Sequence, residues 1–206
     1  MTSLLIGDLP PHLQERVVCS ISAAAKYQVP ANVILAIAEK EGGRPGQWKS
    51  NRNGTHDVGP MQFNTSYLSD LARFGIAADD VAAGGCYSFD LAGWRLRQHM
   101  QKDVGDLWTR AANYHSRTPR YNIVYRADLM HKAKKWAEWL DFQFVTYDLL
   151  EPAAIQTAVV SRQEAKPEVI HSMQRNRSIR ASNTYPRDTK ARYVPRMLIN
   201  MLLESK

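Results

Sequence analysis

Ala31 to Glu41 read ANVILAIAEKE, an apolar stretch that ends in an acid and is followed by the turn GGRPG at Gly42 to Gly46. The apolar residues recur at helical spacing from Ile34, and Glu41 is the i+7 member of that series, about 20° from the direction of Ile34 at roughly 100° per residue. The pattern therefore predicts a helix with Glu41 on its inward face. Glu39 lies about 140° round the same helical wheel, so we expect its carboxylate to be solvated.

Burial of a carboxyl group at the inner end of an apolar helix destabilises its charged form and raises its pKa. A raised pKa is what a general acid needs near neutral pH. The glycine-rich turn ends the helix directly after Glu41 and opens the backbone beside it, where a large substrate can approach. Glu41 is therefore the candidate catalytic acid. From these residues alone, the alternative is an ordinary helix-terminal Glu before a glycine cap.

A second polar group follows at Gly59 to Asn64, which read GPMQFN. Gln62 and Asn64 come directly after a Gly-Pro turn, and their amide side chains offer both donors and acceptors. Such groups can bind the N-acetyl and hydroxyl groups of sugars. We therefore predict that Gln62 and Asn64 bind substrate, with an ordinary polar turn as the alternative.

Together, the helix that ends in Glu41 and the turn GPMQFN resemble the lytic transglycosylase family. The resemblance is to its soluble-lytic-transglycosylase-like members, which are related to goose lysozyme. The resemblance covers roughly Leu13 to Trp139 and is closest to the branch that accompanies conjugation and type IV secretion machines. It implies an all-α, mainly helical, lysozyme-like fold. Gly42 stands where the family commonly has Ser, so the sequence leaves open which group orients the carboxyl group of Glu41; Pro60 stands where the family has Leu.

A third segment, Ala112 to Pro119, reads ANYHSRTP and matches the Tyr-His-Ser-x-Thr-Pro form found in that branch. In the family, the Tyr of this segment lies beside the catalytic Glu. The resemblance therefore implies that Tyr114 donates to the acid or to the sugar, and that His115 shapes the far side of the groove. The alternatives are a buried Tyr and an ordinary His.

The two cysteines, Cys19 and Cys86, lie far apart in the sequence. Spacing alone favours a pair of buried, unlinked thiols. The resemblance instead implies that Cys19 and Cys86 form a disulfide bond. Such a bond would in turn imply an oxidising compartment.

Helical periodicity and capping residues predict the remaining elements. Between the acid and the Gly-Pro turn, the polar, glycine-bearing stretch Trp48 to Thr55 is predicted to be a loop. In the longest of the predicted helices, Val124, Ala127 and Trp136 are expected to face inward. The further helices are expected at Pro11 to Tyr27, Asn64 to Phe74, Ser88 to Met100, Gly105 to Tyr114, and Tyr121 to Phe144.

We divide the 206 residues into a lysozyme-like transglycosylase domain at 1–148 and a basic tail at 149–206. From His171 to Arg196 the tail has seven Lys or Arg residues against one acid, which predicts a flexible, partly disordered segment. Pro195 is expected to open a short amphipathic helix that docks on a partner or folds back, with a solvated tail as the alternative. The formal charge of +7 favours an anionic partner.

The resemblance implies that Glu41 protonates the glycosidic oxygen between N-acetylmuramic acid and N-acetylglucosamine and then acts as a base, giving a 1,6-anhydro product. No second acid lies in a matching motif, which disfavours a double-carboxylate mechanism. The predicted function is a peptidoglycan lytic transglycosylase that opens the wall locally for a secretion or conjugation apparatus. Two alternatives stay open: a hydrolytic muramidase of the same fold, and a non-catalytic wall-binding component of such a machine.

We expect no cofactor and no metal site, because the histidines and cysteines lack ligand spacing. The expected partners are peptidoglycan strands and, through the tail, components of a secretion machine; no signature of nucleic-acid binding is present. The sequence shows no apolar run long enough for a membrane span and no secretory signal at Met1 to Asp8. A wall substrate nevertheless implies the periplasm or cell envelope, so the export route stays open.

Overall fold

The structure, a computed structural model, describes residues 5–149 and 193–197 and is mainly helical, as the sequence predicts. The elements in chain order are η1 (Ile6–Asp8), α1 (Pro11–Tyr27), α2 (Ala31–Glu41), β1 (Trp48–Ser50), β2 (His56–Val58), β3 (Phe63–Asn64), α3 (Thr65–Leu71), η2 (Ala72–Phe74), α4 (Ala78–Ala82), α5 (Tyr87–Lys102), α6 (Leu107–Ala112), α7 (Pro119–Gln143), β4 (Val145–Asp148) and β5 (Tyr193–Arg196).

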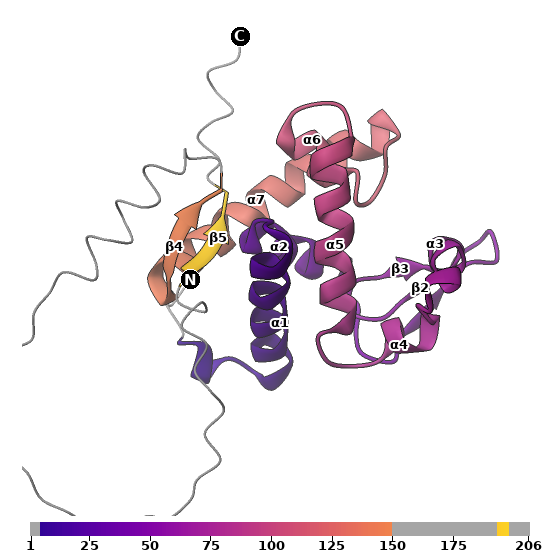
Figure 1. Cartoon of the computed structure of the whole chain (residues 1–206), viewed down its shortest axis with the longest axis horizontal. Coiled ribbons are helices and arrows are strands. Elements are labelled where there is room, and N and C mark those ends of the chain that lie inside the picture. Colours follow the sequence, from indigo (N-terminus) through magenta and orange to yellow (C-terminus); the bar gives the residue numbers. More distant parts are fainter. Residues whose placement is uncertain (1–4, 150–192, 198–206) are drawn as a thin grey trace, which may run out of the picture.

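Helix α2 is the centre of the core, between α1 and α7 (Figure 1). Every residue from Ala31 to Ala38 is buried, so the stretch that predicted the helix is surrounded by protein on all sides. Each large side chain buried there contributes about 1.5–3 kcal/mol to folding. Gly42 ends the helix in the left-handed conformation, with φ +61°, and its N–H donates to the carbonyl of Ala38. The predicted start and end of this helix are thus confirmed.

Helix α1 packs along α5, and the two helices are joined covalently. Cys19 of α1 and Cys86, the residue before α5, form a disulfide bond, which confirms the pairing that the resemblance implies. The helices also approach closely at Gly93, where an added Cβ would lie 3.0 Å from the Cβ of Ala23. A glycine is therefore needed for this packing.

The predicted loop between the acid and the Gly-Pro turn is partly wrong, because Trp48–Ser50 forms strand β1. It pairs antiparallel with β2, which pairs in turn with β3, and Asp57 lies opposite Asn64 in this register. Three-residue strands are too short for alternation to show in a sequence. The sheet lies with α3 and α4 at one end of the molecule, shown at the right of Figure 1.

The predicted inward face of the long helix is wrong in its first half. Val124 is 70% exposed and Ala127 is exposed, whereas Tyr125 and Leu129 are buried. The apolar residues at the start of α7 lie on more than one face, so hydropathy alone does not orient these turns. The buried series Tyr125, Leu129, Ala133, Ala137 and Leu140 continues at helical spacing instead.

Part of the expected tail packs on the domain. Strand β5 runs parallel to β4, and Val194 and Met197 are 0% and 1% exposed. The sequence predicts an amphipathic helix that begins at Pro195. This start is wrong, because Pro195 and Arg196 are extended in β5. The rest of that helix, and the basic segment at 150–192, lie outside the described residues.

Candidate active site

Glu41 lies at the last position of α2, half-buried, and its carboxyl group has a specific partner. The hydroxyl of Tyr125 on α7 donates to Glu41 Oε1 at 2.7 Å. Burial and the charge of Glu41 raise the pKa of Tyr125 well above its ordinary value, so this hydroxyl stays protonated and acts as a donor. Tyr125 therefore fills the orienting role that the sequence left open when Gly42 replaced the usual Ser.

The pKa of Glu41 is raised, and burial is the main cause. The hydrogen bond from Tyr125 acts in the opposite direction because it stabilises the ionised form. The negative charge of Asp57 raises the pKa further, while the positive charges of Lys40 and Arg95 lower it. A carboxyl group whose pKa is raised keeps its proton to a higher pH than an ordinary Glu does, as a general acid requires.

Glu39, the neighbouring acid on the same helix, is exposed, as predicted. Its carboxylate accepts a hydrogen bond from Trp136 Nε1 at 2.8 Å on the outer surface. The two carboxyl groups of α2 thus lie in different environments, and only Glu41 lies among the buried groups of the site.

The Gly-Pro turn is pressed against the end of α2 at Gly43. A Cβ at Gly43 would overlap the carbonyl oxygen of Gly59 and would lie 2.7 Å from Gln62 Nε2. Any side chain at position 43 would therefore push the turn away. Gln62 itself has φ +49°, and its Nε2 donates to the carbonyl of Gly59 at 2.9 Å. Among the described residues, the side-chain oxygen of Gln62 accepts no hydrogen bond.

The side chain of Asn64 makes three hydrogen bonds within the protein. Its Oδ1 accepts from the N–H of Ser66 as the cap of α3, and its Nδ2 donates to Thr55 Oγ1 and Asp57 Oδ1, both at 2.9 Å. Asn64 therefore joins the small sheet to α3 and holds the carboxylate of Asp57. Its predicted contact with substrate would have to form beside these bonds.

Tyr114 is 3% exposed, and its hydroxyl donates to the carbonyl of Met61 at 3.2 Å. The donor to Glu41 is thus Tyr125, where the sequence suggested Tyr114. His115 is exposed and stacks on the ring of Tyr125, with 4.7 Å between ring centroids and 3° between planes. Among the residues that the structure describes, the segment that carries Tyr114 and His115 therefore makes no hydrogen bond to Glu41 itself. Tyr114 contacts the Gly-Pro turn, and His115 contacts Tyr125, the residue that donates to Glu41.

A cationic side chain lies under this part of the site. The guanidinium of Arg95 lies over the rings of Tyr67 and Tyr114, at 4.3 and 4.8 Å from their centroids. Cations near an aromatic face are stabilised by the ring electrons. Arg95 thus holds the two tyrosines together and adds positive potential near Glu41.

Sequence reasoning missed two residues of this site, Tyr125 and Asp57. The signal for Tyr125 was the i+4 series running back from Ala133 through Leu129. The signal for Asp57 was its place next to an apolar residue, Val58, which is buried in the strand. Asp57 lies opposite Asn64 in the register of β2 and β3. Asp57 brings a second carboxylate into the site, although it lies in no motif of two acids.

In residues 5–149 and 193–197, no group of three or more His, Cys, Asp or Glu side chains is placed to hold a metal ion. No helix in this described part of the chain is long and apolar enough to cross a membrane.

Comparison with known proteins gives a family and several relatives. Residues 18–135, more than half of the chain, match the family model described as Transglycosylase SLT domain. The chain is 28% identical over 101 residues to Invasion protein IagB of Salmonella typhimurium, which covers 48% of this chain and 62% of that protein. It is 31% identical over 109 residues to Protein IpgF of Shigella flexneri, which covers 52% of this chain and 70% of that protein. The chain thus spans less than two thirds of the length of IagB.

Proposed function

Because the chain belongs to the transglycosylase SLT domain family, we propose that it is a lytic transglycosylase that cleaves peptidoglycan between N-acetylmuramic acid and N-acetylglucosamine. The observation that carries the proposal is the state of Glu41. This acid is half-buried at the end of α2, its pKa is raised mainly by burial, and it is held by the hydroxyl of Tyr125. These are the properties of a general acid positioned for one proton transfer.

In the proposed reaction, Glu41 gives its proton to the glycosidic oxygen, and the N-acetylglucosamine side leaves with a free 4-hydroxyl group. The oxygen of the 2-acetamido group of the muramic residue attacks C1 as that bond breaks. The Glu41 carboxylate then takes the proton of the muramic 6-hydroxyl, whose oxygen attacks C1 and releases the acetamido group. The product is a 1,6-anhydro ring, and Glu41 has recovered its proton.

Substrate contacts are proposed for Gln62, Asn64, Tyr114 and His115. The support is strongest for Gln62, whose side-chain oxygen accepts no bond in the described part of the chain and which lies against the segment that follows Glu41. The hydroxyl of Tyr114 donates to the carbonyl of Met61, so Tyr114 is proposed to position the Gly-Pro turn beside the sugar that it contacts.

The proposed setting is the periplasm or cell envelope, where the chain would open the wall locally for a secretion or conjugation apparatus. The Tyr-His-Ser-x-Thr-Pro segment supports this setting, and so does the disulfide between Cys19 and Cys86, because such bonds persist in oxidising compartments. The division into a domain at 1–148 and a tail at 149–206 that binds a machine component stays a prediction.

The test is mass spectrometry of the fragments released from purified peptidoglycan. We expect 1,6-anhydro fragments from the wild type and a loss of about 10²–10⁴-fold in Glu41→Gln, the usual contribution of a general acid or base. Glu39→Gln is the matched control, because it makes the same change two residues away on the exposed side of α2 and should keep its activity.

The products decide between the alternatives. Fragments with reducing ends would make the protein a hydrolytic muramidase, in which water takes the place of the 6-hydroxyl. Release of no fragments by the wild type would favour a non-catalytic wall-binding component of a secretion or pilus machine.

A further inference from the structure

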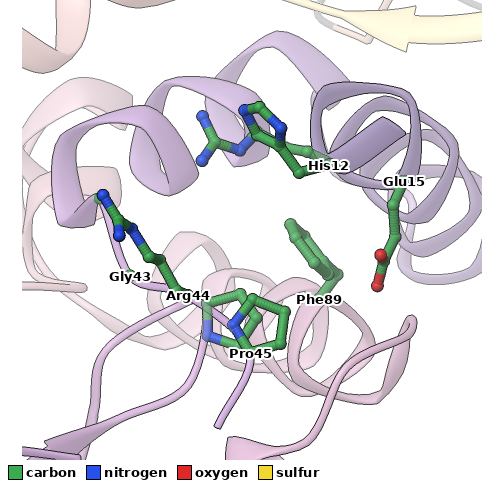
Figure 2. Close-up of a pocket in the computed structure, with 9 residues that line it drawn as sticks. His12, Glu15, Gly43, Arg44, Pro45 and Phe89 are labelled. Atoms are coloured by element: carbon green, nitrogen blue, oxygen red, sulfur yellow. The ribbon is translucent and has the colours of Figure 1, made fainter. Parts of the chain in front are cut away.

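A cavity of about 480 Å³ borders the segment that follows Glu41. Gly42 and Gly43 form part of its wall, and so does Pro60, from the turn that carries Gln62. Helix α1 closes one side of the cavity (Figure 2). The cavity and the candidate acid therefore share a stretch of backbone, although the reaction proposed above makes no use of the cavity.

The lining of this cavity combines two arginines, one histidine and one acid with an apolar base. Arg16 and His12 come from α1, and Arg44 comes from the turn after α2. Figure 2 shows the side chains of His12, Arg44 and Phe89 around the same opening. The apolar part is formed by Phe89 with two prolines, Pro45 and Pro60.

In residues 5–149 and 193–197, no carboxylate forms an ion pair with Arg16 or Arg44, although the charge of Glu39 acts on Arg16. The one acid of the lining, Glu15, accepts a bond at Oε1 from the N–H of Gly85 at 2.5 Å and keeps its negative charge, which the two arginines outnumber. Burial lowers the pKa of Arg16, against the opposing charge of Glu39. Arg16 is partly buried and Arg44 is exposed, so an anionic ligand placed between them would offset the cost of burying the Arg16 charge.

We infer that this cavity is a subsite for the stem peptide of peptidoglycan, in which Arg16 and Arg44 bind a carboxylate of the peptide while Phe89 and the two prolines contact its alanine methyl groups. The inference rests on the proposed function, because it takes the peptide from a muramic residue bound beside Glu41. Guanidinium groups match the planar geometry of carboxylates and bind them with two parallel hydrogen bonds. A volume of about 480 Å³ lies in the usual range for small-ligand sites.

The position of the cavity explains why a peptide fits better than a free anion. Each N-acetylmuramic residue carries its peptide on a lactyl group, so a sugar held at Glu41 brings the carboxylates of that attached peptide near the site. Gly42 and Gly43 have no side chains that would stand between the two sites. Binding energy from the peptide could thus help to position the reacting sugar, as remote contacts do in other enzymes.

The experiment compares two substrates, intact peptidoglycan and glycan strands freed of peptides by an amidase. We expect Arg44→Gln to lower the ratio of kcat/KM on peptide-bearing strands to kcat/KM on peptide-free strands by about tenfold, the effect of one charge-assisted hydrogen bond. Arg16→Gln should act in the same direction. Arg73→Gln, an exposed arginine of η2, is the matched control and should leave the ratio within about twofold of the wild type.

A direct titration with a sugar-free stem tetrapeptide separates this inference from the proposed function. We expect binding at millimolar concentration that is lost in Arg44→Gln, whether or not the wild type cleaves glycan. Cleavage of both substrates with an unchanged ratio in Arg44→Gln and Arg16→Gln, or absence of tetrapeptide binding to the wild type, would overturn the inference. Failure of the wild type to cleave either substrate, with tetrapeptide binding intact, would overturn only the proposed function.

Discussion

At Glu41, burial and hydrogen bonding act on one carboxyl group in opposite directions. Burial disfavours the ionised form, and the Tyr125 hydroxyl, at 2.7 Å, favours it. Asp57 adds to the first effect, while Lys40 and Arg95 add to the second. The proton affinity of Glu41 is therefore a balance that single substitutions should shift in known directions.

Tyr125→Phe removes the donor that stabilises ionised Glu41, so the pKa of Glu41 should rise. The alkaline limb of kcat/KM, where Glu41 loses the proton it must donate, should move to higher pH. Activity at the optimum should fall about tenfold, because a hydrogen bond to a charged group is worth roughly 1.5 kcal/mol or more and also orients the carboxyl group. The pH profile on purified glycan measures both effects. Tyr121→Phe, an exposed tyrosine on the same helix, serves as the control, and an unmoved limb in Tyr125→Phe would contradict the assignment.

Asp57→Asn removes a negative charge that raises the pKa of Glu41, so here the alkaline limb should move to lower pH. Asn keeps an Oδ1 acceptor for the amide of Asn64, so the strand pairing should persist. The same pH profile measures the shift, with the exposed Asp70→Asn as the comparison. If Asp57→Asn and Tyr125→Phe moved the limb in the same direction, the electrostatic account of this site would be wrong.

At the scale of elements, strand β5 is held against α2 by one buried amide. Asn32 Nδ2 donates to the carbonyls of Ala133 and Met197, at 3.1 and 3.0 Å, and Asn32 Oδ1 accepts from the N–H of Met197 at 3.1 Å. Asn32 is 0% exposed, so these bonds satisfy backbone groups that water does not reach. A single side chain thus links α2, α7 and the segment after β5.

Asn32→Ala should destabilise the fold by about 2–4 kcal/mol, because it leaves buried backbone groups of Met197 and Ala133 without partners. Urea denaturation followed by circular dichroism measures the free energy of unfolding. Asn53→Ala, in the turn between β1 and β2, removes two solvent-exposed hydrogen bonds from Thr55 and should cost no more than about 1 kcal/mol. Equal effects of the two substitutions would show that β5 does not dock on α2 in solution.

At the scale of the whole molecule, two links tie distant parts of the chain to the central helices. The disulfide joins α1 to the start of α5 across a sequence separation of 67, and β5 joins the C-terminal region to β4. Glu41 is the last residue of α2, and Gly43 lies against the Gly-Pro turn that joins β2 to β3. The site is therefore assembled where the helical core meets β1 to β3.

Replacing both cysteines, Cys19→Ser with Cys86→Ser, should lower the free energy of unfolding by up to about 4 kcal/mol, the chain-entropy value for a loop of this length. Urea denaturation of the wild type with and without a reductant provides the measurement. Reduction should bring the wild type to the midpoint of the double variant and should leave the double variant unchanged. A wild type insensitive to full reduction would mean that the bond does not stabilise the fold.

The sequence by itself determined the long helices and the position of Glu41 at the end of α2. Apolar spacing and the glycine after Glu41 defined α2 to the residue, and the prolines and polar caps defined the starts of α1 and α3. These features depend on interactions within one or two helical turns, which a local pattern encodes. The resemblance to a family added the cysteine pair, which spacing alone did not favour.

Only the tertiary structure decided which groups surround Glu41. The Tyr125 hydroxyl meets Glu41 across 84 residues of sequence, and the Met197 backbone meets Asn32 across 165. Such contacts depend on which face of α7 turns inward and on which segment pairs with β4. Hydropathy leaves both open, because Val124 is as apolar as a core residue and yet is exposed. Side-chain partners that lie so far apart in the sequence are determined by the packing of whole helices. No single stretch of the chain specifies that packing.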